Sequence, residues 1–284
     1  MENKSIPHSI QVNGNLIDLS SPKVMGIINA TPDSFYSGSR VDGERQITER
    51  VMSVIDEGAD FIDIGACSTR PNAPLATQQE EIKRLRKILT VIQKIAPDTV
   101  MSVDTFRSNV AKMCVEEFGV GMINDISGGE MDKDMFDTVA CLKVPYIMMH
   151  MRGTPETMQQ NTHYKHLRLE MTQYFAHKVY ALQERGVNDI ILDPGFGFGK
   201  TAEQNYELLG HLEEWQQFQL PLLVGMSRKS MIYNTLGITP EESLNGTTAV
   251  NVIAMMKGAN ILRVHDVKAC VEATKIFNAM KNTL

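Results

Sequence analysis

The 284-residue chain lacks several features that would assign it to a class at once. Its four cysteines form no CxxC pair and no Cys/His spacing typical of zinc, which argues against a disulfide framework or a structural zinc site. No apolar run is long enough to cross a bilayer, and the first ten residues lack the apolar core of a signal peptide. The net charge of −6 is not that of a general nucleic-acid binder. We therefore expect a cytoplasmic protein without nucleic-acid or membrane partners, with free thiols at Cys67, Cys114, Cys141 and Cys270.

Two nucleotide-binding signatures are also missing. The first apolar run ends in NATPDSF (29–35) instead of a glycine fingerprint, which disfavours an open doubly wound sheet. The segment GFGFGKT (195–201) resembles a phosphate-binding P-loop, but Pro194 stands where the GxxxxGK[ST] pattern requires glycine. We therefore reject an ATPase. The glycines instead predict a tight loop that places Phe198 against a flat ligand.

What the chain does contain is one pattern repeated about eight times between Val24 and His265. A short apolar run ends in a polar residue, and a helix-like stretch follows, at 46–57, 78–95, 108–117, 132–142, 164–185, 203–216, 245–257 and 269–280. Little alternation within the runs is typical of strands covered by helices. The pattern predicts a single α/β domain over 1–284, a (β/α)8 TIM barrel over 24–284.

A separate feature precedes the repeat. Apolar residues at Ile10, Val12, Leu16 and Leu19 flank Asn13-Gly14, which is a strong signal for a two-residue type I′ turn. We expect residues 1–20 to contain an N-terminal β-hairpin that covers the amino-terminal end of the barrel.

In a parallel barrel the polar residues that end the strands gather at one mouth. Asp104, Asn124 and Asp193 would form a deep, acceptor-rich pocket that suits a flat ligand edge with several N–H groups. Lys229 would add a donor and keep the acids ionised. The alternative, ordinary polar packing inside the barrel, stays open for any one of these residues.

A second group of strand-end residues has the chemistry of an anion site. Arg70, Arg263 and His265 could grip a diphosphate together with Asn29, with Mg²⁺ bridging the phosphates. A surface ion pair is the alternative for any single arginine. The loops at 30–44 and 68–77 are long and poor in apolar anchors, so we expect them to act as mobile lids.

The motifs resemble, in order, those of the dihydropteroate synthase family. They are MGIINATPDSF (25–35), GADFIDIGACSTRP (58–71), SVDTF (102–106), INDISGG (123–129), MMHMRGTPETMQ (148–159), LDPGFGFGKT (192–201), VGMSRKS (224–230) and GANILRVHDV (258–267). The resemblance implies a homodimeric TIM-barrel transferase of folate biosynthesis and a target of sulfonamides. Its reaction would condense 6-hydroxymethyl-7,8-dihydropterin diphosphate with 4-aminobenzoate by a dissociative displacement, with Mg²⁺, to give 7,8-dihydropteroate and diphosphate.

The resemblance also implies site residues, position by position. The pterin pocket would comprise Asp104, Asn124, Met148, Asp193, Lys229 and Arg263. The diphosphate and metal region would hold Asn29, Arg70 and His265, with Asn29 as the metal ligand. The 4-aminobenzoate side would hold Thr69, Pro71, Phe198 and Ser230. The catalytic set would be Asn29, Arg70, Asp104, Lys229, Arg263 and His265.

The chain departs from the family pattern in two loops. Cys67 and Asn72 replace Glu and Gly of GGESTRPG, and SFYSGSR replaces SFSDGG. Two other functions remain as alternatives: a folate-dependent corrinoid methyltransferase, which would share the pterin pocket, and a non-catalytic pterin-binding protein.

Overall fold

The structure is a computed structural model that describes residues 9–30, 40–67 and 75–283. Its eight parallel strands are β3 (Lys23–Asn29), β4 (Phe61–Gly65), β5 (Met101–Asp104), β6 (Met122–Asp125), β7 (Tyr146–Met149), β8 (Ile190–Asp193), β9 (Leu223–Val224) and β10 (Ile261–Val264). They pair in the order β8-β7-β6-β5-β4-β3-β10-β9. A parallel bridge between Leu192 and Leu222 joins the first and last members and closes the ring. The predicted barrel is confirmed.

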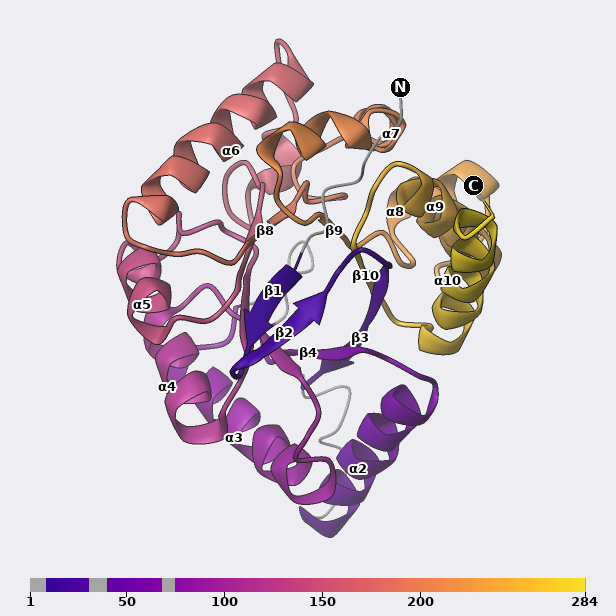
Figure 1. The fold of residues 1–284 in the computed structure, drawn as a ribbon. Helices are drawn as coiled ribbons and strands as arrows, with labels where there is room; N and C mark the ends of the chain where they lie inside the picture. Colours follow the sequence, from indigo (N-terminus) through magenta and orange to yellow (C-terminus); the bar gives the residue numbers. More distant parts are fainter. Residues whose placement is uncertain (1–8, 31–39, 68–74, 284) are drawn as a thin grey trace.

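Helices surround this ring in Figure 1. They are α2 (Arg40–Asp56), α3 (Gln78–Ile95), α4 (Ser108–Phe118), α5 (Met135–Leu142), α6 (Leu167–Gln183), α7 (Ala202–Gly210), α8 (Ser230–Leu236), α9 (Leu244–Met256) and α10 (Val267–Lys281), with the 3₁₀ turns η1 (Met158–Gln160) and η2 (Leu212–Phe218). Capping boxes begin α3 at Thr77 and α7 at Thr201, where each side chain accepts a backbone N–H of the first turn.

Several helix predictions differ from the structure: α2 begins at Arg40 instead of residue 46, for example, and α6 begins at Leu167 instead of residue 164. The stretch predicted as one helix over 203–216 divides, because α7 ends at Gly210 and a 3₁₀ turn follows. The eight predicted helical stretches do not include the short helix α8. The helix α5 begins at Met135, not at Asp132, because the Asp132 carboxylate accepts the backbone N–H groups of Ser108 and Asp134 instead.

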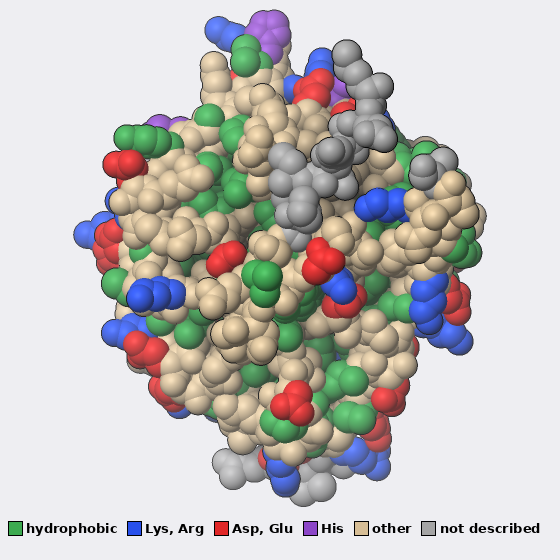
Figure 2. Space-filling view, in the orientation of Figure 1, with side chains coloured by type: hydrophobic (Ala, Val, Ile, Leu, Met, Phe, Trp, Pro, Cys, Tyr) green, Lys and Arg blue, Asp and Glu red, His purple; other side chains and the backbone are tan. Residues whose placement is uncertain are grey.

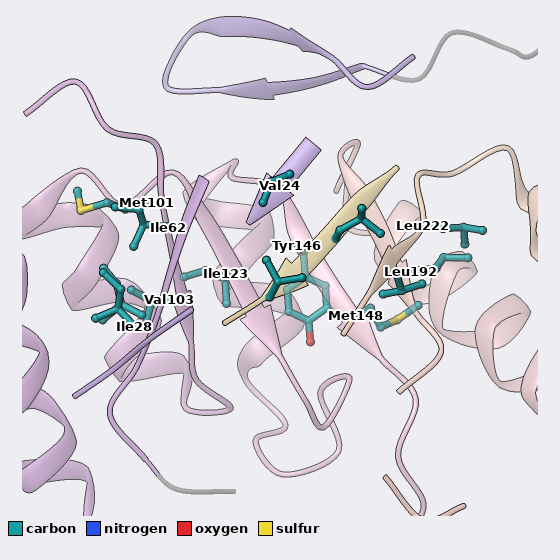
Figure 3. Close-up of a cluster of buried hydrophobic side chains, with 14 of the residues drawn as sticks. Val24, Ile28, Ile62, Met101, Val103, Ile123, Tyr146, Met148, Leu192 and Leu222 are labelled. Atoms are coloured by element: carbon teal, nitrogen blue, oxygen red, sulfur yellow. The ribbon is translucent and has the colours of Figure 1, made fainter. Parts of the chain in front are cut away.

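The outward faces of the strands pack against the helices in one large core. Figure 3 shows members of this cluster, among them Ile28, Ile62, Val103, Ile123 and Leu192. Because strand side chains alternate, the residues between these positions point into the barrel. The inward residues Met25, Phe61, Met122, Ile147 and Ile191 belong to a second cluster.

The predicted hairpin is also confirmed and covers one end of the barrel. Strands β1 (Ser9–Val12) and β2 (Asn15–Asp18) pair antiparallel around Asn13 and Gly14, whose φ angles are +49° and +80° as a type I′ turn requires. In Figure 1 the hairpin lies across the barrel opening. Its buried side chains, Ile10 and Val12, and Leu19 just after it, join the inward cluster at the start of the strands.

Figure 2 views this same face, and Lys and Arg are interspersed with Asp and Glu around it. Among the described residues no helix combines the length and the hydropathy needed to span a bilayer.

Candidate active site

The opposite end of the barrel carries a row of polar residues in register. Asn29, Gly65, Asp104 and Asn124 are direct cross-strand partners on β3, β4, β5 and β6. Gly65 has no side chain and lies between Asn29 and Asp104 in this row. A Cβ at this position would be 3.6 Å from the Asp104 Cβ and 3.9 Å from the Asn29 Oδ1. Asn29 and Asp104 therefore face one shared space at the mouth.

Arg263 crosses the barrel interior and holds two carboxylates. Its Nε donates to Asp63 Oδ2 at 2.6 Å, and its Nη2 donates to Asp104 Oδ2 at 3.0 Å. The Asn124 amide also donates to Asp63 Oδ2, at 3.1 Å. The structure thus places Arg263 with the deep pocket instead of leaving it free among the diphosphate residues. Asp63 was missed by sequence reasoning, although a single acid inside the apolar run FIDIG was a usable signal.

Burial opposes charge on these acids. Burial is the main reason why the pKa of Asp104 is raised to about 7. The Asp63 carboxylate acts in the same direction, and the Arg263 guanidinium acts against it. Burial also raises the pKa of Asp193, which Lys229 and the Gly195 N–H partly offset. Lys229 thus favours the charged form of Asp193, whereas the ion-pair partner of Asp104 is Arg263.

Asp193 ends β8, Lys229 directly precedes α8, and the two side chains interact electrostatically. The Gly195 N–H donates to Asp193 Oδ1 at 2.8 Å, and the Lys229 ammonium donates to the Phe196 carbonyl. Asp193 supports the charge of Lys229, but burial still lowers the lysine pKa to about 8. Lys229 remains mainly protonated at neutral pH and joins the pocket to the loop after β8.

Met148 does not line this pocket, so its prediction is wrong. Its side chain is buried in the helix-facing core, as Figure 3 shows, and its register partner Leu192 lies in the same core. The next residue, Met149, pairs in register with Asp193 and belongs to a cluster at the mouth. A shift of one residue along a strand reverses the face, and the sequence run MMHM gives no means to choose between the two.

His265 directly follows β10, and its side chain is uncharged. Its Nδ1 lies 3.1 Å from Ser227 Oγ. Burial, together with the nearby guanidinium groups of Arg263 and Arg228, lowers the pKa of His265 to about 4. Arg228 itself is paired with Asp266. His265 can therefore offer a phosphate a hydrogen bond at neutral pH, but not a positive charge.

The proposed 4-aminobenzoate side is described only in part. Phe198 packs beside an apolar cluster at the mouth, and its ring centroid lies 4.5 Å from the Lys229 Nζ. Ser230 is exposed at the first residue of α8. Thr69, Arg70 and Pro71 lie outside the described residues, as do Asn72 and most of the two predicted lid loops.

Comparisons with known proteins agree with this arrangement. A family model described as pterin binding enzyme matches residues 25–265, a range that runs from β3 to His265. The dihydropteroate synthase of Escherichia coli K12 is 41% identical over 270 residues, which are 94% of each chain. The chain belongs to the dihydropteroate synthase family. Membership confirms the expected class, a transferase of folate biosynthesis.

Solved dihydropteroate synthases share the fold. The enzyme of Yersinia pestis in a sulfonamide drug complex has a TM-score of 0.88 and 40% identity, covering 97% of this chain and 100% of that one. The enzyme of Xanthomonas albilineans with 4-aminobenzoic acid has a TM-score of 0.87 and 34% identity, covering 97% and 99%.

One family departure is visible in the described residues. Cys67, which replaces the family's Glu, is half-buried and packs against the apolar cluster at the mouth. Burial raises the pKa of its thiol, so the reactive thiolate is disfavoured. Cys67 thus fits a packing role at the base of the second loop.

Proposed function

We propose that this dihydropteroate synthase family member condenses 6-hydroxymethyl-7,8-dihydropterin diphosphate with 4-aminobenzoate, giving 7,8-dihydropteroate and diphosphate. The observation that carries the proposal is the pocket at the strand ends. Its carboxylate and amide oxygens from Asp104, Asn124 and Asp193 match the N–H-rich edge of a pterin. Lys229 connects that pocket to Phe198, so a second flat substrate beside the pterin would meet the same ammonium group.

The chemistry we propose is a dissociative displacement. The C–O bond between the pterin CH₂ group and diphosphate breaks first, and the electron pair leaves with diphosphate. The buried carboxylates stabilise the cation that develops on the pterin, since fixed charges act strongly where water is excluded. The neutral aromatic amine then forms the C–N bond and releases one proton, so a strong general base is not required.

Asn29 and His265 would receive the departing diphosphate, with Arg70 from the second loop. The uncharged His265 donates a hydrogen bond, and the charge must come from arginine and from a cation.

The residues fit Mg²⁺ as a cation held mainly by substrate. Among the described residues, no three His, Cys, Asp or Glu side chains gather to hold a metal ion. Mg²⁺ commonly takes one or two protein oxygens, several waters and substrate phosphates. Asn29 would supply one such oxygen, and the bound ion would offset charge on the leaving diphosphate.

One assay tests the activity against its alternatives. The purified protein is mixed with the pterin diphosphate and Mg²⁺, and diphosphate release is followed with and without 4-aminobenzoate. We expect release only with 4-aminobenzoate. Methyl transfer from a methylfolate to a corrinoid protein would replace this proposal with the methyltransferase, and tight pterin binding without turnover would favour the binding protein.

We also propose that the enzyme is a homodimer through α9 and α10. An apolar groove of about 650 Å³ opens between these helices, with exposed fractions of 66% at Met256 and 73% at Ile276. Its other apolar lining residues are Leu244, Val252, Ala269, Ala273, Phe277 and Met280. A surface of this kind is typical of an interface, and a second copy offers a matching face by two-fold symmetry.

Light scattering after gel filtration tests the dimer. We expect twice the chain mass for the wild type and the single chain mass for Ile276→Glu, which places a charge in the groove. Leu169→Glu, at an exposed leucine on α6, is the matched control and should remain dimeric. We further propose a cytoplasmic location, where the free thiols of the chain stay reduced.

A further inference from the structure

Lys200 ends the GFGFGK segment, yet its side chain is only 4% exposed and turns into the protein. Its Nζ lies 3.0 Å from the Gly195 carbonyl, 3.0 Å from the Phe198 carbonyl and 3.2 Å from the His150 carbonyl. It also lies 3.0 Å from His150 Nδ1. An ammonium group has three N–H donors, so these four acceptors use its full capacity. Lys200 therefore does not serve phosphate as a P-loop lysine does.

The acceptors of Lys200 belong to two different elements. Gly195 and Phe198 lie in the loop 194–199 that follows β8, and His150 follows the end of the neighbouring strand β7. Lys200 thus ties the loop to itself and to the adjacent strand end. The three glycines of the loop have φ angles of +68°, +79° and +61°, a region that other residues rarely adopt. Such a backbone has many alternative states, so it needs strong anchors to hold one of them.

The anchored loop presents two groups to the mouth. The Phe196 carbonyl accepts from the Lys229 ammonium, and the Phe198 ring lies 4.5 Å from the same nitrogen. The loop also approaches β7 closely, since a Cβ on Gly195 would lie 2.1 Å from the His150 carbonyl oxygen. A small displacement of the loop would therefore move both groups relative to the strand ends, which carry the proposed pterin pocket.

We propose that Lys200 is a positioning residue for the second-substrate side of the site: it holds the loop 194–199 so that Phe198 stacks on 4-aminobenzoate. This rests on the proposed function for the identity of the substrate. Two residues of the pterin pocket contact the loop, since Asp193 accepts the Gly195 N–H and Lys229 donates to the Phe196 carbonyl, whereas Asp104 and Asn124 lie on β5 and β6. The pterin pocket should therefore depend on the loop less than the Phe198 ring, which the loop itself carries. The loss of Lys200 should accordingly affect the two substrates unequally.

Lys200→Met tests this, because methionine has a similar length and no donors. We expect the KM for 4-aminobenzoate to rise about tenfold or more, while the Kd for the pterin diphosphate changes less than about threefold. The matched control is Lys178→Met. Lys178 is another largely buried lysine, but its ion-pair partner is Glu130 and its ammonium lies near the rings of Phe136 and Tyr174, none of which belongs to the loop 194–199, so both constants should stay unchanged. Equal losses for both substrates in Lys200→Met would overturn the proposal.

A double-mutant cycle tests whether Lys200 acts through Phe198. In Phe198→Ala the ring is gone, so adding Lys200→Met should raise the KM for 4-aminobenzoate little further. Independent effects that multiply in the double mutant would overturn the proposal.

Hydrogen exchange of the full-length protein gives a readout that needs no substrate. The Gly197 N–H donates to Asn205 Oδ1 at 2.7 Å, and the Phe198 N–H donates to the Gly195 carbonyl at 3.1 Å. Both amides should exchange at least tenfold faster in Lys200→Met, while amides of β5 and β6 keep their rates. Unchanged exchange would overturn the anchoring role, whether or not the enzyme uses 4-aminobenzoate.

A second variant covers the case in which Lys200→Met does not fold. Asn205→Leu removes another anchor of the same loop at a buried site, since the Asn205 side chain bonds to Gly197 and Thr201. It should produce the same unequal change in the two substrates. An unchanged KM for 4-aminobenzoate in this variant would count against the loop as the positioning element.

Discussion

The two ends of the barrel differ although the same strands build both. At the hairpin end the inward residues are apolar, as Met25 on β3 and Phe61 on β4 illustrate, and Ile10 and Leu19 cover them. Further along the same inward faces stand Asn29 and Asp63. One end therefore buries apolar surface and supplies stability, and the other keeps polar groups available for ligands.

Polar residues between the two ends also leave buried atoms without hydrogen-bond partners. Asp63 Oδ1 and Ser102 Oγ are register partners on β4 and β5, and neither has a hydrogen-bond partner among the described residues. Unpaired buried polar atoms lower stability, typically by about 1–3 kcal/mol each. The polar part of the barrel thus gives up stability, whereas the apolar hairpin end supplies it.

The largest expected effect is on stability at the hairpin end. Leu19→Ala should lower the free energy of unfolding by about 3 kcal/mol, since it leaves a cavity in a fully buried cluster. Urea denaturation measures it. Leu16→Ala, in the same hairpin but 75% exposed, should change stability by less than about 0.5 kcal/mol. A tenfold change in KM for either substrate in Leu19→Ala would contradict the separation of the two ends.

The next effect concerns two acids near β8: Asp193, its last residue, and Asp189, which directly precedes it. Asp193→Asn should weaken binding of the pterin diphosphate about 10- to 100-fold in calorimetry, because the N–H groups of the pterin lose a charged acceptor. Asp189, just before the same strand, instead accepts the Gln11 N–H of the hairpin at 3.3 Å. Asp189→Asn is therefore the matched control and should leave pterin affinity unchanged. Unaltered affinity in Asp193→Asn would remove it from the pocket.

A third prediction concerns the pH dependence of stability. Asp104 has a pKa of about 7 in the folded protein, against 3.8 for the free side chain. The folded state thus holds this proton more tightly, so this group's contribution to stability is lost as the pH rises from about 4 to 7. Asp104→Asn should stabilise the protein at pH 8, on the order of 2 kcal/mol, and much less near pH 4.

Urea denaturation of wild type and Asp104→Asn at both pH values checks this. The variant should bind the pterin diphosphate more weakly even though it is more stable. A variant that is less stable than wild type at pH 8 would show that the pairing with Arg263 outweighs burial.

The smallest effect concerns the orientation of His265. Ser227→Ala removes the hydroxyl 3.1 Å from its Nδ1. We expect kcat to fall about three- to tenfold, as one ordinary hydrogen bond allows, with pterin affinity retained. Steady-state kinetics and calorimetry measure the two. A parallel loss of pterin affinity would assign Ser227 to the pocket instead of the leaving-group side.

Much of the fold could be predicted from the sequence because its signals are local. Apolar runs and turn residues depend on near neighbours, so the eight strands, the hairpin and most helices were predicted. The short helix α8 was not, because seven residues carry too little periodicity. The division of the predicted helix at Gly210 likewise depends on packing of η2, where Trp215 is buried.

The sequence predicted which residues lie at the site, but not all of their orientations or bonding partners. Asp104, Asn124, Asp193 and Lys229 do gather at the mouth, as strand ends in a parallel barrel must. The choice of Met148 over Met149 was wrong, because the face of a strand residue depends on the register of its neighbours. The role of Lys200 was invisible as well, since its acceptors are backbone carbonyls that only the folded loop brings together.

The barrel, the covered end and the polar mouth can be read from the sequence alone, because they follow from the order of apolar runs and polar ends. The charge states of the site residues and the partners that they hold depend on the folded arrangement. The pairing of Arg263 with Asp63 and Asp104, the neutral His265 and the buried Lys200 arise from residues far apart in the chain. Burial and distance set these properties, and neither exists before the chain folds.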